Sequence, residues 1–123
     1  YKMLECKALK TALDNIFTKD QKRAAEVMQF YYDYYLSMKN VASQIKQGGH
    51  ICYVVGNRIV KNTQLPTDIF TAWVFEKEGF EYLKTYVRDI PNKRMPSRNS
   101  PTNKTGVTNS TMVHEYIVVC RKN

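Results

Sequence analysis

The chain has 123 residues and a net charge of +8 at neutral pH, with 43% hydrophobic and 24% charged residues. This composition is typical of a globular protein and not of a disordered one, and no apolar run approaches the roughly 18 residues that a membrane-spanning helix needs. The length fits one domain at most, so residues 1–123 are predicted to form a single domain or part of one. No signal peptide is evident, so we expect a cytoplasmic protein.

The first part of the chain is predicted to be helical. Residues 1–18 have weak helical periodicity, which indicates a short helix, and residues 19–47 have a much stronger one, which predicts one long amphipathic helix. The apolar positions of this long helix are Ala24, Val27, Met28, Tyr31, Tyr34, Tyr35, Met38, Val41, Ala42 and Ile45. Gly48-Gly49 then supplies the permissive backbone that ends a helix and turns the chain into a strand.

The remainder is predicted to alternate strands with one helix. The expected elements are a buried strand at 50–55, a loop at 62–65, a short helix from Pro66 to a C-terminal cap at Gly79, and strands at 80–90 and 113–120. This order predicts an α/β fold in which helices cover a sheet, and strands separated by a helix normally pair in parallel. No helix-forming pattern separates the last two strands, so we expect a mixed sheet with its last strand antiparallel to the neighbouring strands.

One edge of this sheet is the expected ligand site. The end of the first strand (56–58), the end of the second (from Arg88) and the start of the third (Thr111 and Met112) should all lie there. In open α/β sheets, ligands bind at the carboxyl ends of the parallel strands.

The connection between the last two strands is strongly basic. Residues 84–104 contain six basic residues and one acidic residue, which accounts for most of the net charge. A basic loop at the ligand edge of a sheet indicates a polyanion such as nucleic acid. The alternative is a solvated charged loop without a ligand. The candidate phosphate-binding or base-binding residues in this segment are Arg88, Lys93, Arg94 and Arg98.

The other candidates favour structural roles. Tyr31, Tyr32, Tyr34 and Tyr35 could offer a stacking platform for bases, but tyrosines at helical spacing are more often core residues. His50 and His114 each lack a partner at catalytic or metal-binding spacing. Three widely spaced cysteines, Cys6, Cys52 and Cys120, lack the paired spacing of a zinc site and indicate buried free thiols. We therefore predict no metal site.

Several segments, taken in their order along the chain, resemble one enzyme family. They are Tyr53-Val54-Val55-Gly56-Asn57-Arg58, Gln64-Leu65-Pro66-Thr67-Asp68, Glu78-Gly79-Phe80, Arg88-Asp89-Ile90-Pro91-Asn92-Lys93-Arg94-Met95-Pro96, Asn99-Ser100-Pro101 and Thr111-Met112-Val113-His114-Glu115-Tyr116-Ile117-Val118-Val119. Together they resemble the C-terminal part of amino-group DNA methyltransferases, the N4-cytosine and N6-adenine type. The resemblance covers roughly residues 20 to 122.

The resemblance implies the C-terminal portion of a class I, Rossmann-like methyltransferase fold. It implies S-adenosylmethionine as methyl donor, a DNA base as acceptor, and a target base that is flipped out of the duplex. Asn57 and Arg58 would form part of the base pocket, and Arg88, Lys93, Arg94 and Arg98 would contact DNA. The same resemblance associates the chain with restriction-modification.

Two signatures of that family are absent from this sequence. All four prolines stand alone, so no Ser, Asp or Asn is followed by Pro-Pro-Tyr, and no glycine loop for the methyl donor is present. We therefore assign no catalytic residues and expect a piece of a larger methyltransferase domain that binds S-adenosylmethionine through the parent protein. Two alternatives remain open, an RNA methyltransferase of similar fold and a non-catalytic, methyltransferase-like subunit that binds nucleic acid.

Overall fold

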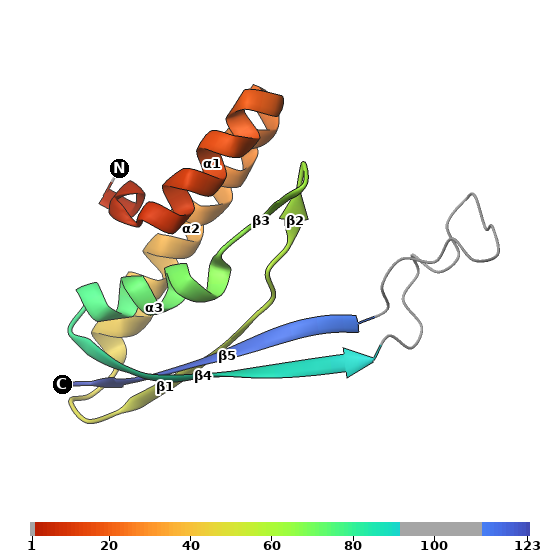
Figure 1. Cartoon of the computed structure of the whole chain (residues 1–123). Helices are drawn as coiled ribbons and strands as arrows, with labels where there is room; N and C mark the ends of the chain where they lie inside the picture. The colour runs from red at the N-terminus through yellow and green to blue at the C-terminus, as the bar shows by residue number, and fades with distance from the viewer. Residues whose placement is uncertain (1, 92–111) are drawn as a thin grey trace.

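A computed structural model describes residues 2–91 and 112–123 of the chain (Figure 1). The elements are η1 (Lys2–Glu5), α1 (Lys7–Lys19), α2 (Gln21–Gln44), β1 (His50–Val55), β2 (Ile59–Val60), β3 (Thr63–Gln64), α3 (Thr67–Lys77), β4 (Phe80–Pro91) and β5 (Met112–Lys122). The long helix α2, the short helix α3 and the three main strands β1, β4 and β5 lie where the sequence predicts them. Gly79 has a φ of 92°, as expected of a residue just past a helix end.

The helices form layers on one face of the main sheet. Helix α3 packs against all three strands of that sheet and also against α1 and α2, which run side by side on its outer side (Figure 1). The core between these layers contains three large side chains that are fully buried, Tyr31 of α2 and Phe70 and Phe75 of α3. The ring of Tyr31 meets the ring of Phe70 edge to face, with centroids 5.0 Å apart. Helix α3 is therefore the central layer of the fold.

The main sheet has the order β1-β5-β4, and β5 is antiparallel to both neighbours. The prediction of an α/β fold whose last strand is antiparallel is thus confirmed. The expected parallel pairing of the first two main strands is wrong, because β5 lies between β1 and β4. Both pairings described in the main sheet are antiparallel, so the prediction of a mixed sheet is wrong as well. The shared edge is confirmed where it is described, since Val55 at the end of β1 and Val87 near the end of β4 both pair with Tyr116 of β5.

A small hairpin replaces the loop predicted at residues 62–65. Strands β2 and β3 pair across a two-residue turn in which Lys61 and Asn62 have φ values of 50° and 63°. Two consecutive left-handed residues are the geometry of the tight turns that fit the twist of a hairpin, and Asn adopts this conformation more readily than most residues. The backbone N–H of Leu65 donates to the carbonyl of Arg58 at 2.7 Å, which extends the hairpin toward β1 and α3.

The opposite face of the main sheet is open among the described residues. Cys52 and Val54 of β1 point to this face, together with their β5 partners Val119 and Ile117, and Val54 is 60% exposed. Figure 1 shows no described element on that side. Cys6 and Cys120 are buried free thiols as predicted, but the prediction is wrong for Cys52, which is exposed because strand alternation turns it toward the open face.

The last strand also closes the end of α2. The Nζ of Lys122 donates to the carbonyls of Ala42 and Ile45, both at 2.9 Å, at the C-terminal end of α2, where carbonyls lack the usual N–H donor four residues on. The Ala42 carbonyl also accepts the backbone N–H of Ile45 at 3.3 Å. Gly48 has a φ of 83°, and a Cβ on Gly49 would lie 2.9 Å from the carbonyl oxygen of Lys46. The turn from α2 into β1 therefore requires both glycines. The hydrogen bonds from Lys122 of β5 stabilise the end of α2 that leads into this turn.

Replacing Lys122 with Met should destabilise the fold by about 1 to 3 kcal/mol, because the variant keeps the aliphatic stem and loses two hydrogen bonds from a charged group. Urea denaturation followed by circular dichroism measures this loss. The matched control is Arg121→Met, which removes only an exposed ion pair with Glu81 at 3.7 Å and should change stability by less than about 1 kcal/mol. Equal losses in the two variants would contradict the role of Lys122 in closing α2.

Candidate functional site at the carboxyl end of β1

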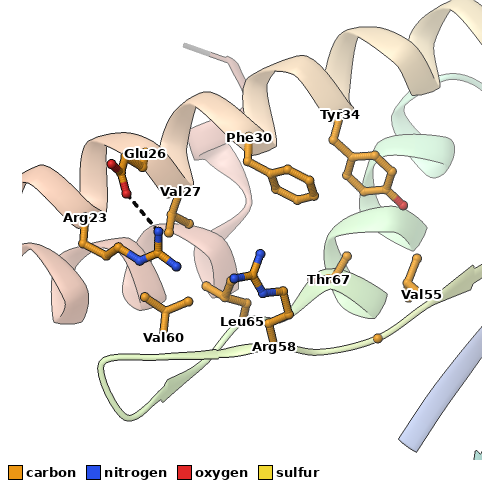
Figure 2. A pocket seen from close by; sticks show the side chains of 11 residues that line it. Arg23, Glu26, Val27, Phe30, Tyr34, Val55, Arg58, Val60, Leu65 and Thr67 are labelled. Atoms are coloured by element: carbon orange, nitrogen blue, oxygen red, sulfur yellow. Dashed lines mark hydrogen bonds and ion pairs between the residues drawn. The ribbon is translucent and has the colours of Figure 1, made fainter. Parts of the chain in front are cut away.

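A pocket of about 240 Å³ opens where β1 ends, between α2 and the segment that leads from β1 into the small hairpin (Figure 2). It is lined by Arg23, Glu26, Val27, Phe30, Tyr34, Val55, Gly56, Arg58, Val60, Leu65 and Thr67. The walls are mostly aliphatic and aromatic, and the polar groups are few. Small-molecule sites typically have this composition.

Asn57 fixes the junction between β1 and α3 on one side of the pocket. Its side-chain oxygen accepts the backbone N–H groups of Thr67 at 3.1 Å and Asp68 at 3.3 Å, and its amide nitrogen donates to the Asp68 carboxylate at 2.9 Å. The first N–H groups of a helix have no partner within the helix, and Pro66 at the N-cap offers no side-chain acceptor. Asn57, ten residues upstream, supplies the missing cap, so all of its described side-chain contacts are structural.

A ladder of hydroxyl groups joins α2 to α3 behind the pocket. Tyr31 and Thr67 share a hydrogen bond of 2.7 Å, and so do Tyr34 and Thr71. The Thr71 hydroxyl donates to the carbonyl of Thr67, so Tyr34 must be the donor in its own pair. Burial raises the pKa of Tyr31 to about 12, and it raises the pKa of Tyr34 to about 12 as well. Both phenols therefore stay protonated at neutral pH and hold the two helices together.

Arg58 is the cation of the pocket. Its guanidinium reaches into the space between α2 and the hairpin segment (Figure 2). Among residues 2–91 and 112–123, no acidic side chain pairs with it. The other charged groups of the lining, Arg23 and Glu26, form an ion pair with each other at 2.8 Å. The pocket therefore keeps one net positive charge, which favours an anionic group on whatever binds there.

The other predicted nucleic-acid contacts are placed differently. Arg88 lies on β4 where β4 and β5 extend beyond β1, and it pairs with Glu115 across the two strands at 2.8 Å. On the next rung, Asp89 pairs with His114. Lys93, Arg94 and Arg98 lie outside the described residues. All four stay predictions as nucleic-acid contacts, and Arg88 could reach phosphate only by sharing or giving up Glu115.

Phe30 is a pocket residue that the sequence patterns did not single out. Its side chain is 52% exposed, although its ring contacts those of Tyr31 and Tyr34 on α2. Helical spacing could have identified it, because Phe30 follows Val27 by three positions and therefore lies on the same face of the helix. The tyrosines of that face are inward-facing, as expected for core residues. The exposed ring is the phenylalanine next to them.

Among residues 2–91 and 112–123, membrane-spanning helices and metal-binding clusters are both absent. No helix in the described ranges is long and apolar enough to cross a membrane. No group of three or more His, Cys, Asp or Glu side chains in those ranges could hold a metal ion. The one carboxylate in the lining of this pocket, that of Glu26, is held by Arg23, so the lining offers no free carboxylate to anchor the ribose of a nucleoside cofactor and does not fit a site for S-adenosylmethionine.

Comparison with known proteins shows a relationship to a methyltransferase. The sequence is 44% identical over 112 residues to the type II methyltransferase M.MvaI of Kocuria varians. The match covers 91% of this chain and 25% of that protein, so the chain spans about a quarter of its relative's length. Identity of this extent indicates common descent, and the chain is therefore homologous to a segment of a type II methyltransferase. No protein-family description and no solved structure matches the chain.

Replacing Asn57 with Ala should destabilise the fold by about 1 to 2 kcal/mol, because two backbone N–H groups at the start of α3 lose their acceptor. Thermal or urea denaturation gives the size of the loss, and hydrogen exchange should show faster exchange at Thr67 and Asp68. Asn40→Ala, at an exposed position in α2, is the control and should be neutral or slightly stabilising. Unchanged exchange at Thr67 and Asp68 would show that Asn57 does not cap α3.

Proposed function

We propose that this chain is part of a DNA methyltransferase and forms the C-terminal portion of its class I catalytic domain. The observation that carries the proposal is the 44% identity over 112 residues to a type II methyltransferase. The fold supports it, because β1 and β4 run parallel with an antiparallel β5 between them and a pocket opens at the carboxyl end of β1.

The acceptor in this proposal is the exocyclic amino group of cytosine or adenine. This choice rests on the resemblance to amino-group methyltransferases of the sequence segments quoted above, taken in their order along the chain. The target base would leave the helical stack to reach the enzyme. Arg58 would lie in the wall of the base pocket, and Asn57 would hold that wall in place. The protein would work on DNA in the cytoplasm, as a member of a restriction-modification system.

The catalytic residues and the methyl donor site would lie in the remainder of the protein. Two features support a larger domain around this chain. The outer edge of β1 has no strand partner among the described residues, and the open face of the sheet exposes Val54 at 60% together with Tyr86 at 51%. Unpaired strand edges and exposed apolar faces are normally covered in native proteins. S-adenosylmethionine, bound by the remainder, would supply the methyl group.

A methyl-transfer assay tests the proposal directly. The full-length protein that contains this chain should transfer labelled methyl groups from S-adenosylmethionine to duplex DNA and not to RNA. Digestion of the product to nucleosides should then give N4-methylcytosine or N6-methyladenine. Transfer to RNA alone would favour the RNA enzyme. Binding of DNA without any transfer would favour the non-catalytic subunit.

The basic connection gives a second test. Replacing Lys93 and Arg94 together with Ala should weaken DNA binding and lower the slope of log affinity against log salt by about 0.9 for each phosphate that is no longer neutralised, because fewer counterions are released. Titrations at several salt concentrations measure this slope. Lys2→Ala with Lys7→Ala, at exposed positions on η1 and α1, removes the same charge and is the control. An unchanged slope in the Lys93 and Arg94 variant would mean that this segment is only solvated.

A further inference from the structure

We propose that the pocket at the end of β1 receives a single nucleobase, with its ring stacked on Phe30 and its flanking phosphate at Arg58. This inference rests on the proposed function and assigns a role to Phe30 that no resemblance supplied. It also changes the role of Asn57 from a pocket contact to a positioning residue.

The ring of Phe30 contacts two tyrosines, yet its side chain is 52% exposed. It stacks on Tyr34 with centroids 6.0 Å apart and planes at 18°, and it meets Tyr31 edge to face at 5.4 Å. Both tyrosines are anchored in turn by hydrogen bonds to α3. Figure 2 shows Phe30 projecting from α2 into the pocket. A flat apolar surface that is already ordered can stack a planar ligand with little loss of conformational freedom.

The size of the pocket restricts the ligand. Its volume of about 240 Å³ lies below the roughly 300 to 1,000 Å³ of sites for drug-sized molecules. A single heterocyclic ring system with its first substituent is of a size that matches this volume. The aliphatic walls formed by Val27, Val60 and Leu65 suit the faces and edges of such a ring.

The charge of the pocket selects for a nucleotide over a neutral base. Arg58 has no acidic partner among the described residues, and the Arg23–Glu26 pair leaves the balance at one positive charge. The guanidinium group is suited to phosphate because its donors form a rigid fork. Asn57 fixes the backbone next to Arg58 through its contacts with the start of α3, so the cation is presented from a defined position.

Binding of free mononucleotides to the full-length protein tests the inference. Cytidine and adenosine 5′-monophosphate are titrated by calorimetry or NMR and compared with the nucleosides that lack phosphate. Phe30→Leu should weaken binding of the preferred nucleotide by about tenfold, because base stacking on an aromatic ring contributes about that much. Phe30→Tyr, which retains a ring, should bind like the unchanged protein. Arg58→Gln should remove the advantage of the nucleotide over the nucleoside.

Phe17→Leu is the matched control, because Phe17 is 53% exposed on α1 and lies outside this pocket. It should leave nucleotide binding unchanged. The inference is overturned if neither mononucleotide binds at millimolar concentration, or if Phe30→Leu binds as tightly as Phe30→Tyr. The proposed function is judged separately by methyl transfer. If nucleotide binding depends on Phe30 but the protein transfers no methyl group, the assignment of a nucleobase site stands and the proposed methyltransferase function is rejected.

Discussion

The hydrogen bonds between Asn57 and the start of α3 are the constraint on which the site depends. They join the last turn of chain after β1 to the first turn of the helix that lies at the centre of the fold. Because α3 also carries the threonines bonded by Tyr31 and Tyr34, one amide side chain fixes the sheet edge, the central helix and, through that helix, the position of α2. The pocket lies where these three elements meet. The capping of α3 by Asn57 therefore contributes directly to the shape of the pocket.

The polar interactions of this region are divided between structure and recognition. The buried phenols and threonine hydroxyls pair with one another, and Asn57 uses both ends of its amide on α3. Arg58 is the polar group of the pocket that is left for a ligand. Buried polar groups are costly unless they are paired. Since the one lining cation without an acidic partner in the described part of the chain is exposed, the site keeps its charge without destabilising the fold. Recognition and stability thus depend on neighbouring residues with distinct contacts.

Much of the architecture could be predicted from the sequence because it depends on local patterns. The helical spacing from Ala24 to Ala42 and the glycine at position 79 identify α2 and the end of α3 directly. The position of β5 between β1 and β4 could not be predicted, because strand order depends on pairing between distant segments and the same pattern fits more than one order. The role of Asn57 was hidden for the same reason, since its partners lie ten and eleven residues further along the chain. Phe30 was overlooked because the neighbouring tyrosines explain the apolar face of α2 without it.

The three thiols of the chain differ in their exposure to solvent, and therefore in how readily a reagent can reach them. Cys6 and Cys120 are buried, and burial raises the pKa of Cys120 to about 11, so neither should react readily with alkylating reagents. Cys52 lies exposed on the open face of the sheet, beside Val54. A single maleimide label would therefore attach at this position, without any engineered cysteine. Any segment that covers that face in a larger protein would protect Cys52. The rate of alkylation of Cys52 therefore reports whether the open face of the sheet is covered.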